Sequence, residues 1–306
     1  MTIARGGVAL AGTLVLPDGP GSHPVVLMLH GSGPLDRDEN MDGQKLDVFN
    51  RLAEALAAAG YASLRYDKRG CGASGGDYPS LGYADLVADA RAWADLLAAD
   101  IRMGPLYFLG HSEGTVIAAK AARGRGDVAG LILLCPYVED GETILMAQAR
   151  AMERLLDGLS GWRGVVARLW RRLFGGPERQ QRRLIARLRA GTEPVMRMRG
   201  QTVAARALRD FLISDNAGVH AAVVVPSLVF GAGKDIQCNP ADVARIAALH
   251  PAATAVVIDD LTHVLRRDSG AHGFGSYAGL LRRDMDPVVA GTVIGWLDRR
   301  GADHPN

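Results

Sequence analysis

Residues 106–122 read LYFLGHSEGTVIAAKAA, and this stretch decides the fold. Its first four residues are apolar and predict a short buried strand, and residues 115–122 predict a helix. Between them, Gly110-His111-Ser112-Glu113-Gly114 has the spacing of a nucleophile elbow, a sharp turn that lifts a serine hydroxyl above the end of a sheet. Glycine-rich chains can produce this pattern by chance, so its position between a strand and a helix carries the argument for Ser112 as a nucleophile.

The rest of the chain alternates in the same way between short apolar runs and longer segments of helical period. Continuous apolar runs predict strands at 25–29, 62–66, 106–109, 131–135, 228–230 and 255–258. Helices are predicted at 48–59, 83–98, 114–122, 241–249 and 287–299, and an antiparallel start at about 8–16. Such alternation predicts an α/β protein with a mostly parallel, doubly wound sheet.

Residues 139–220 break this rhythm, with helix-like sequence and no convincing strand. We interpret them as a helical cap inserted into a core made of 1–138 and 221–306. Residues 139–215 hold 15 Arg and no Lys against 9 Asp and Glu, so the cap is basic. Apolar residues in 162–174 form a wide helical stripe. We favour a lid over the acyl pocket for this stripe, and a membrane-surface or oligomer contact is the alternative.

A serine nucleophile needs a histidine base and a carboxylate that orients it. The strand at 228–230 is followed by Asp235, and the strand ending at 258 is followed by His263. Both residues are therefore predicted at the carboxyl ends of successive strands, where open α/β sheets place their sites. The order serine, acid, histidine is the one this topology requires. We predict Ser112, Asp235 and His263 as the catalytic triad.

Other residues near these positions have alternative interpretations. His272 is the competing base, although a surface-loop histidine is the simpler interpretation. Glu139 and Asp140 follow the strand at 131–135, where some enzymes of this topology carry their acid. His111 is expected to pack locally, because it faces the wrong way to take a proton from its neighbour, and His30 is expected to be structural.

The oxyanion of an acyl-transfer intermediate needs backbone N–H donors. Glu113, which follows the nucleophile, should supply one. The loop after the strand at 25–29 should supply the other, with Ser32 the first choice and Gly33 the second. Asp36-Arg37-Asp38 is expected to form a local ion-pair brace. In the segment 66–72, Asp67 and Arg69 are expected to anchor the loop.

Composition sets broad limits. The chain has 306 residues, 48% of them hydrophobic, and a net charge of +2, which gives no general reason to expect nucleic acid or membrane as a partner. The N-terminus alternates like a strand and does not resemble a signal peptide, and no apolar run is long enough to span a bilayer. Three scattered cysteines predict free thiols in a cytoplasmic protein, with no disulfide framework or zinc cluster.

These segments together resemble the α/β-hydrolase superfamily, and within it a bacterial group of carboxylesterases and serine aminopeptidase-like hydrolases. The resemblance rests on the HGSGPxDRD loop at 30–38, the YDKRGxGxSxG segment at 66–76, the GHSEG elbow at 110–114, Asp235 and His263. It covers residues 10–137 and 225 to the C-terminus and does not reach the cap. It implies the α/β-hydrolase fold, activity on short acyl esters, and no metal or organic cofactor.

We therefore expect a serine hydrolase that cleaves a carboxylic ester through an acyl-enzyme. Acyl-CoA thioesterase activity is an alternative suggested by the basic cap, and an aminopeptidase-like hydrolase is another suggested by the resemblance. A non-catalytic binding protein would normally have lost a triad residue, and all three are present. The expected partner is a small-molecule ester, without nucleic acid or membrane contact, and self-association through the cap stays open.

Overall fold

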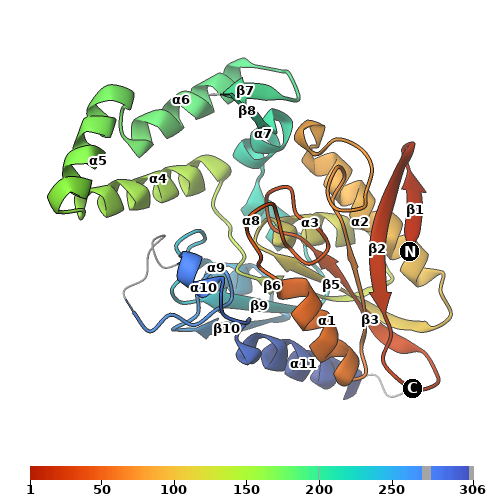
Figure 1. Ribbon diagram of the computed structural model, residues 1–306. Helices are drawn as coiled ribbons and strands as arrows, with labels where there is room; N and C mark the ends of the chain where they lie inside the picture. Colours follow the sequence, from red (N-terminus) through yellow and green to blue (C-terminus); the bar gives the residue numbers. More distant parts are fainter. Residues whose placement is uncertain (199, 271–276, 303–306) are drawn as a thin grey trace.

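The centre of the protein is an eight-stranded sheet (Figure 1). The structure, a computed structural model, describes residues 1–198, 200–270 and 277–302. The strand order is β1-β2-β4-β3-β5-β6-β9-β10, antiparallel at the β1–β2 and β2–β4 pairs and parallel elsewhere. The strands are β1 (Thr2–Arg5), β2 (Val8–Val15), β3 (His23–Leu29), β4 (Ala62–Tyr66), β5 (Met103–His111), β6 (Val128–Leu134), β9 (Ser227–Ala232) and β10 (Ala253–Ile258).

Helices cover both faces of this sheet because its central strands are apolar on both sides. On β3, Val25 and Leu27 point into one hydrophobic core, and Val26 and Met28 point into the other. The first core also receives α2 (Tyr83–Ala98), α3 (Glu113–Ala122) and α9 (Asp242–Leu249); the second receives α1 (Val48–Ala58) and α11 (Pro287–Ala302). The predicted doubly wound α/β fold is confirmed, with most element ends within about three residues of the predicted ones.

The described part of residues 139–221 forms four longer helices and one short one. They are α4 (Gly141–Asp157), α5 (Gly161–Phe174), α6 (Pro177–Ala190), α7 (Ala205–Ile213) and α8 (Asn216–Ala221). The expectation that this interval has no strand is wrong, because β7 (Met196–Met198) and β8 (Gln201–Val203) form a small antiparallel hairpin. Strands of three residues are too short to show a periodicity in sequence. Helices α4, α5 and α6 stand away from the sheet (Figure 1), whereas α8 packs against α3 and α9.

A separate small core holds these outer helices together. It contains Met146, Ile185, Leu188, Ala205 and Leu212, from α4, α6 and α7. Helix α7 is also tied to α2 by an ion pair of 3.0 Å between Arg206 and Asp85. Helix α5 contributes no residue to this small core.

The parallel strands end at one edge of the sheet, and the loops that follow them meet there. Gly31 follows β3, Ser112 follows β5, Asp235 follows β9 and His263 follows β10. The three cysteines are buried and free, in agreement with the predicted thiols. Among the described residues, no helix combines the length and apolar character needed to cross a bilayer.

The tightest contact of the elbow lies between α3 and β3, and it predicts an effect of substitution. A Cβ added at Gly114 would overlap the backbone carbonyl oxygens of Leu29 and His30. Gly114→Ala should therefore destabilise the protein by about 1–3 kcal/mol, because neither strand nor helix can move freely. Urea denaturation measures this change.

Gly291, in α11, is the matched control, since an added Cβ there would meet no atom within 4 Å. Gly291→Ala should leave stability unchanged or raise it by about 0.5–1 kcal/mol through helix propensity. Equal stability changes in the two variants would contradict the steric interpretation.

Candidate active site

Ser112 occupies a strained turn between β5 and α3. Its backbone has φ 53° and ψ −118°, outside the regions that non-glycine residues normally adopt. The turn is held on both sides: the Ser112 N–H donates to the Leu134 carbonyl at 2.9 Å, and the Ser112 carbonyl accepts from the Thr115 hydroxyl at 2.7 Å. The predicted elbow is thus present in the structure, with the serine half-buried beside a cavity.

Asp235 and His263 are brought into direct contact. Asp235 Oδ2 lies 2.7 Å from His263 Nδ1, and both residues are buried. The other carboxylate oxygen, Oδ1, accepts the backbone N–H groups of Gln237 at 2.7 Å and Cys238 at 2.8 Å. A carboxylate held by this many donors has a fixed orientation, and its contact with Nδ1 leaves Nε2 of His263 as the ring nitrogen that can accept a proton.

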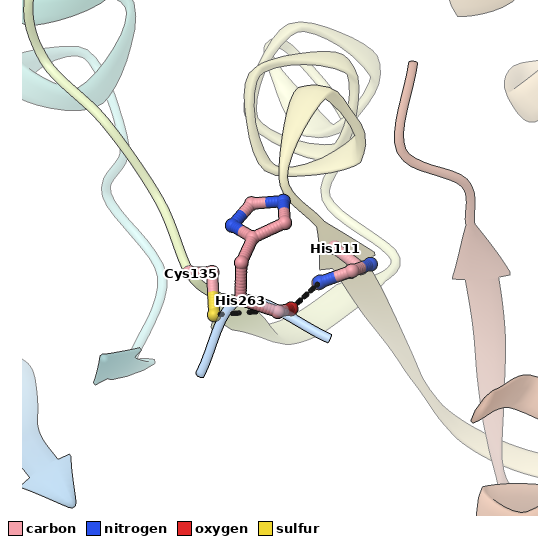
Figure 2. Close-up of side chains that lie close together, drawn as sticks. All are labelled: His111, Cys135 and His263. Carbon is pink, nitrogen blue, oxygen red and sulfur yellow. Dashed lines mark hydrogen bonds between the residues drawn. The ribbon is translucent and has the colours of Figure 1, made fainter. Parts of the chain in front are cut away.

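The backbone of the His263 loop is held by two other side chains. His111 Nε2 lies 3.0 Å from the His263 carbonyl oxygen, and the Cys135 thiol contacts the same oxygen at 4.0 Å. Figure 2 shows this carbonyl between His111 and Cys135, while the imidazole of His263 projects away from it. The expectation that His111 only packs locally is wrong, because it bridges the elbow to a loop 152 residues away.

His111 is in turn paired with Glu39, a residue that the sequence analysis did not identify. His111 Nδ1 lies 2.9 Å from Glu39 Oε2, and the Gly31 N–H donates to Glu39 Oε1 at 2.8 Å. Burial opposes both charges, but their mutual attraction outweighs it, so the pKa of Glu39 is lowered and that of His111 is raised. Glu39 and His111 therefore form a buried ion pair that links the loop after β3 to the elbow.

Lys68 is the second residue that the sequence analysis missed. Its ammonium donates to the carbonyl oxygens of Gly31 at 2.5 Å and Gly33 at 3.2 Å, and it lies 3.4 Å from Glu113 Oε2. It is almost fully buried. Lys68 follows Asp67 in the YDKRG segment, but hydropathy gives no signal that a lysine is buried. These contacts hold the carbonyl groups of the predicted oxyanion loop in place. The backbone N–H groups between them therefore also have a fixed orientation.

The predicted oxyanion donors lie beside the nucleophile. A Cβ added at Gly31 would stand 3.5 Å from the Cβ of Ser112. Ser32 and Glu113 both line the cavities next to Ser112, and within the described part of the chain neither backbone N–H has a hydrogen-bond acceptor. The Gly33 N–H lies instead beside the Tyr78 hydroxyl. Burial raises the pKa of this hydroxyl, and the Gly33 N–H lowers it in part. This arrangement favours Ser32 over Gly33 as the second donor.

The remaining predicted residues are structural. Arg37 pairs with Asp67 at 2.6 Å and Asp38 with Arg65 at 2.6 Å, so the expected local brace in 36–38 is instead a brace between two loops. The expected anchoring by Asp67 and Arg69 is confirmed, since Arg69 also pairs with Asp89 at 2.6 Å. His30 packs against the rings of Phe49 and Tyr66, and burial lowers its pKa to about 4, which keeps it neutral.

The alternative acids do not approach Asp235 or His263. Glu139 pairs with Arg245 at 3.1 Å, and Asp140 caps α4 by accepting the Thr143 N–H at 2.9 Å. His272 lies outside the described residues.

Strained backbone is concentrated around this site. Among the described non-glycine residues, five have a positive φ, and four of them are Glu39, Ser112, Cys135 and Leu265, each at or next to a site residue. Strain of this kind persists only where surrounding contacts over-determine the conformation. Here those contacts are the hydrogen bonds that hold the three loops.

Two groups of side chains at the site have donor atoms close enough to hold a metal ion. They are His111, Cys135 and His263, and Asp235, Cys238 and His263. Burial raises the pKa of both cysteine thiols well above the usual value, and metal ligation requires the thiolate. Cys238 lines the same cavity as Ser112. These groups suit a neutral packing role around the triad better than metal binding.

Two cavities meet at Ser112. The larger, of about 750 Å³, is bounded by Gly31, Glu39, Lys45, His263 and Arg282. The smaller, of about 350 Å³, is mostly apolar and lies under the outer helices, with walls that include Tyr78, Tyr137, Ile144, Leu208 and Phe211. Among the outer helices, α4 and α7 contribute described wall residues to the smaller cavity and α5 contributes none. The expectation that the stripe at 162–174 is the lid over this pocket is therefore wrong.

The Glu39–His111 pair predicts a pH-dependent stability. Glu39→Gln keeps an oxygen for the Gly31 N–H but removes the charge that raises the His111 pKa. The pair stabilises the fold fully in the pH range in which the unfolded chain has an ionised glutamate and a protonated histidine. The contribution of His111 to stability is then lost as pH rises through its raised pKa. The variant should be less stable than wild type by about 3 kcal/mol near pH 5.5, and by less toward pH 9.

Urea denaturation across this pH range tests the prediction, with Glu54→Gln on α1 as the matched control. Glu54 is exposed and pairs with Arg51 on the surface, so its loss should change stability by no more than about 0.5 kcal/mol at any pH. A constant difference between Glu39→Gln and wild type over the whole range would refute the ion pair.

Known proteins resemble this chain in both sequence and structure. The curated esterase EstD of Thermotoga maritima is 28% identical over 146 residues, which are 48% of this chain and 35% of that protein. The aligned part of the chain thus spans about a third of this relative's length. Two solved structures match almost the whole chain. They are Est1E of Butyrivibrio proteoclasticus with bound ferulic acid (TM-score 0.66, 18% identity, 99% of each chain) and the α/β hydrolase GrgF of Penicillium sp. (0.60, 16%, 99% and 98%).

At these identities the solved structures establish the fold, and the family comes from the sequence. The family model described as serine aminopeptidase, S33, matches residues 42–270, which include the elbow, Asp235 and His263. The chain therefore belongs to the serine aminopeptidase S33 family of α/β hydrolases.

Proposed function

We propose that this protein hydrolyses carboxylic esters through an acyl-enzyme on Ser112. The observation that carries the proposal is the 2.7 Å contact between Asp235 and His263, because His263 lines the same cavity as Ser112. A buried carboxylate that fixes the histidine tautomer, next to a serine on a strained elbow, is the arrangement that activates a serine hydroxyl. The esterase names of EstD and of several solved neighbours agree with it.

In the proposed mechanism, His263 Nε2 accepts the hydroxyl proton as Ser112 Oγ attacks the ester carbonyl. The carbonyl π electrons move to its oxygen, which accepts hydrogen bonds from the backbone N–H groups of Glu113 and Ser32. Asp235 stabilises the imidazolium. The intermediate collapses as the C–O bond to the alcohol breaks and His263 protonates that oxygen. Water, deprotonated by His263, then attacks the acyl-enzyme, and Ser112 recovers its proton.

The two cavities support a proposal for where the two halves of the ester bind. The leaving oxygen must lie within reach of His263 Nε2, and His263 lines the larger cavity but not the smaller one. The alcohol therefore belongs in the larger cavity, and the acyl group in the smaller, apolar cavity under α4 and α7. A volume of about 350 Å³ suits a short or singly aromatic acyl group. Est1E, whose structure holds ferulic acid, makes aromatic acyl esters worth including among the substrates.

A second candidate is an acyl-CoA or other ester with an anionic leaving group. It is favoured by Lys45 and Arg282, two exposed cations on the wall of the larger cavity. The basic character of the cap does not support it, since the arginines of α5 and α6 are not among the wall residues of either cavity. Comparing an acyl-CoA with a neutral ester of equal acyl length would separate the two candidates.

Aminopeptidase activity has less support. A peptide α-ammonium group needs a free carboxylate, and the glutamates on the described cavity walls are Glu39 and Glu113. Glu39 is buried against His111, and Glu113 faces Lys68. Both negative charges are already matched by cations of the protein.

Ser112→Ala should abolish hydrolysis of p-nitrophenyl acetate, with a loss of at least about 10³-fold in kcat, because no other group can form the acyl-enzyme. Labelling of the wild type by a fluorophosphonate should also be lost. Ser80→Ala, on the short helix Tyr78–Ser80, is the serine control and should keep both properties. Absence of wild-type labelling would instead indicate a binding protein on this scaffold.

The assignment of the cavities can be tested with a pair of alanine-to-tryptophan variants. Ala207→Trp, on α7, should fill the smaller cavity and selectively reduce kcat/KM for butyryl and longer esters by about tenfold or more. Ala278→Trp, in the larger cavity, should instead discriminate against bulky alcohols at constant acyl length. The reverse pattern would exchange the acyl and alcohol sites.

A further inference from the structure

Helix α5 exposes its large apolar side chains and buries its small ones. Gly164 and Ala167 face the protein, whereas the outward face carries six apolar residues that are at least half exposed. These are Trp162 (73%), Val165 (56%), Val166 (55%), Leu169 (56%), Leu173 (66%) and Phe174 (50%). Helices that face water normally show the opposite arrangement. We call this set the α5 face.

The α5 face continues into an apolar groove between α4 and α5. This groove has a volume of about 420 Å³ and is lined by Met152, Leu156, Leu159, Trp162, Val166 and Trp170, among others. It is separate from the cavities at Ser112. Figure 1 shows α5 at the far end of the outer helices, on the side away from the sheet. An apolar surface of this extent at the tip of a protein marks a contact with another apolar phase.

Positive charge surrounds this surface. Residues 161–190 contain nine arginines and one acidic residue, Glu178. Arg163, Arg168 and Arg172 on α5 and Arg179 on α6 are exposed, and the guanidinium of Arg163 lies 5.7 Å from the centre of the Trp162 ring. A tryptophan-containing apolar face flanked by arginines is the composition of helices that lie in the interface of an anionic bilayer.

This charge also argues against a second copy of the chain as the occupant. In a symmetric dimer through the α5 face, each arginine-rich rim would meet an identical rim, and like charges repel when they are brought together. Anionic lipid headgroups instead attract each exposed arginine while the acyl chains receive the apolar residues.

We propose that the α5 face and the arginines around it bind the surface of an anionic lipid bilayer, with α5 lying in the plane of the interface. Trp162, Leu169 and Leu173 enter the region between headgroups and acyl chains, and Arg163, Arg168 and Arg172 contact lipid phosphates. The first half of α4 lines the smaller cavity at Ser112, and its second half lines the α5 groove. The membrane contact thus lies on the helix that covers the proposed acyl site.

Co-sedimentation of the full chain with vesicles tests this proposal. Binding to phosphatidylcholine vesicles with about 30% phosphatidylglycerol should be at least about tenfold stronger than to phosphatidylcholine alone, and should weaken in high salt. Tryptophan emission should shift to shorter wavelength on binding, because Trp162 is exposed whereas Trp93 and Trp296 are already buried.

Matched variants distinguish binding through the α5 face from non-specific hydrophobic binding. The triple variant Trp162→Ser, Leu169→Ser, Leu173→Ser should lose vesicle binding by about tenfold or more. The control, Ile101→Ser, Ile213→Ser, Val224→Ser, removes three even more exposed apolar residues elsewhere and should bind as wild type does. Arg168→Glu with Arg172→Glu should weaken binding by on the order of tenfold, whereas Arg123→Glu with Arg299→Glu should have little effect.

Circular dichroism and hydrolysis of p-nitrophenyl acetate check that each variant is folded. Three results would overturn the proposal: no binding of wild type to anionic vesicles, equal binding by the α5 triple variant, or a concentration-dependent dimer that the α5 variant abolishes without any vesicle binding. Because vesicle binding is measured without substrate, it stands or fails independently of the proposed esterase activity.

Discussion

The buried pair of Glu39 and His111 is the interaction on which the site depends. Through it, the loop after β3, the elbow after β5 and the loop after β10 are held together, by way of the Gly31 N–H and the His263 carbonyl. Burying two charges is costly, and such a pair is stable only when further hydrogen bonds satisfy its remaining atoms. Gly31 and His263 supply those bonds, so the ion pair holds three loops in a fixed arrangement.

Around this pair, the chemistry is divided between rigid and adaptable parts of the chain. The proposed triad and oxyanion loop follow strand ends, where packing on both faces of the sheet limits movement. Lys68 fixes the carbonyls of the oxyanion loop, and backbone N–H groups fix Asp235. One wall of the smaller cavity comes instead from α4 and α7, which contribute to a core of their own. In the proposed function, reaction type and substrate choice therefore depend on different segments.

Positive charge is distributed very unevenly along the chain, although the net charge is small. A total of +2 includes a stretch of 30 residues, 161–190, that holds nine arginines and one acid. These charges surround an apolar face that packs against no part of the described protein core, and they lie away from the cavities at Ser112. The basic character of the cap thus bears on what the outer helices contact, and much less on which ester enters the site.

Sequence alone determined the α/β fold, the position of the elbow and the contact between Asp235 and His263, because strand and helix periodicities are local and strand ends share one edge of a parallel sheet. Only the tertiary structure decided that Glu39 and His111, 72 residues apart, form a pair, and that Lys68 is buried. Periodicity also grouped the apolar residues of 162–174 on one helix face. It could not decide whether that face points inward or outward, because a helix has the same pattern in either orientation.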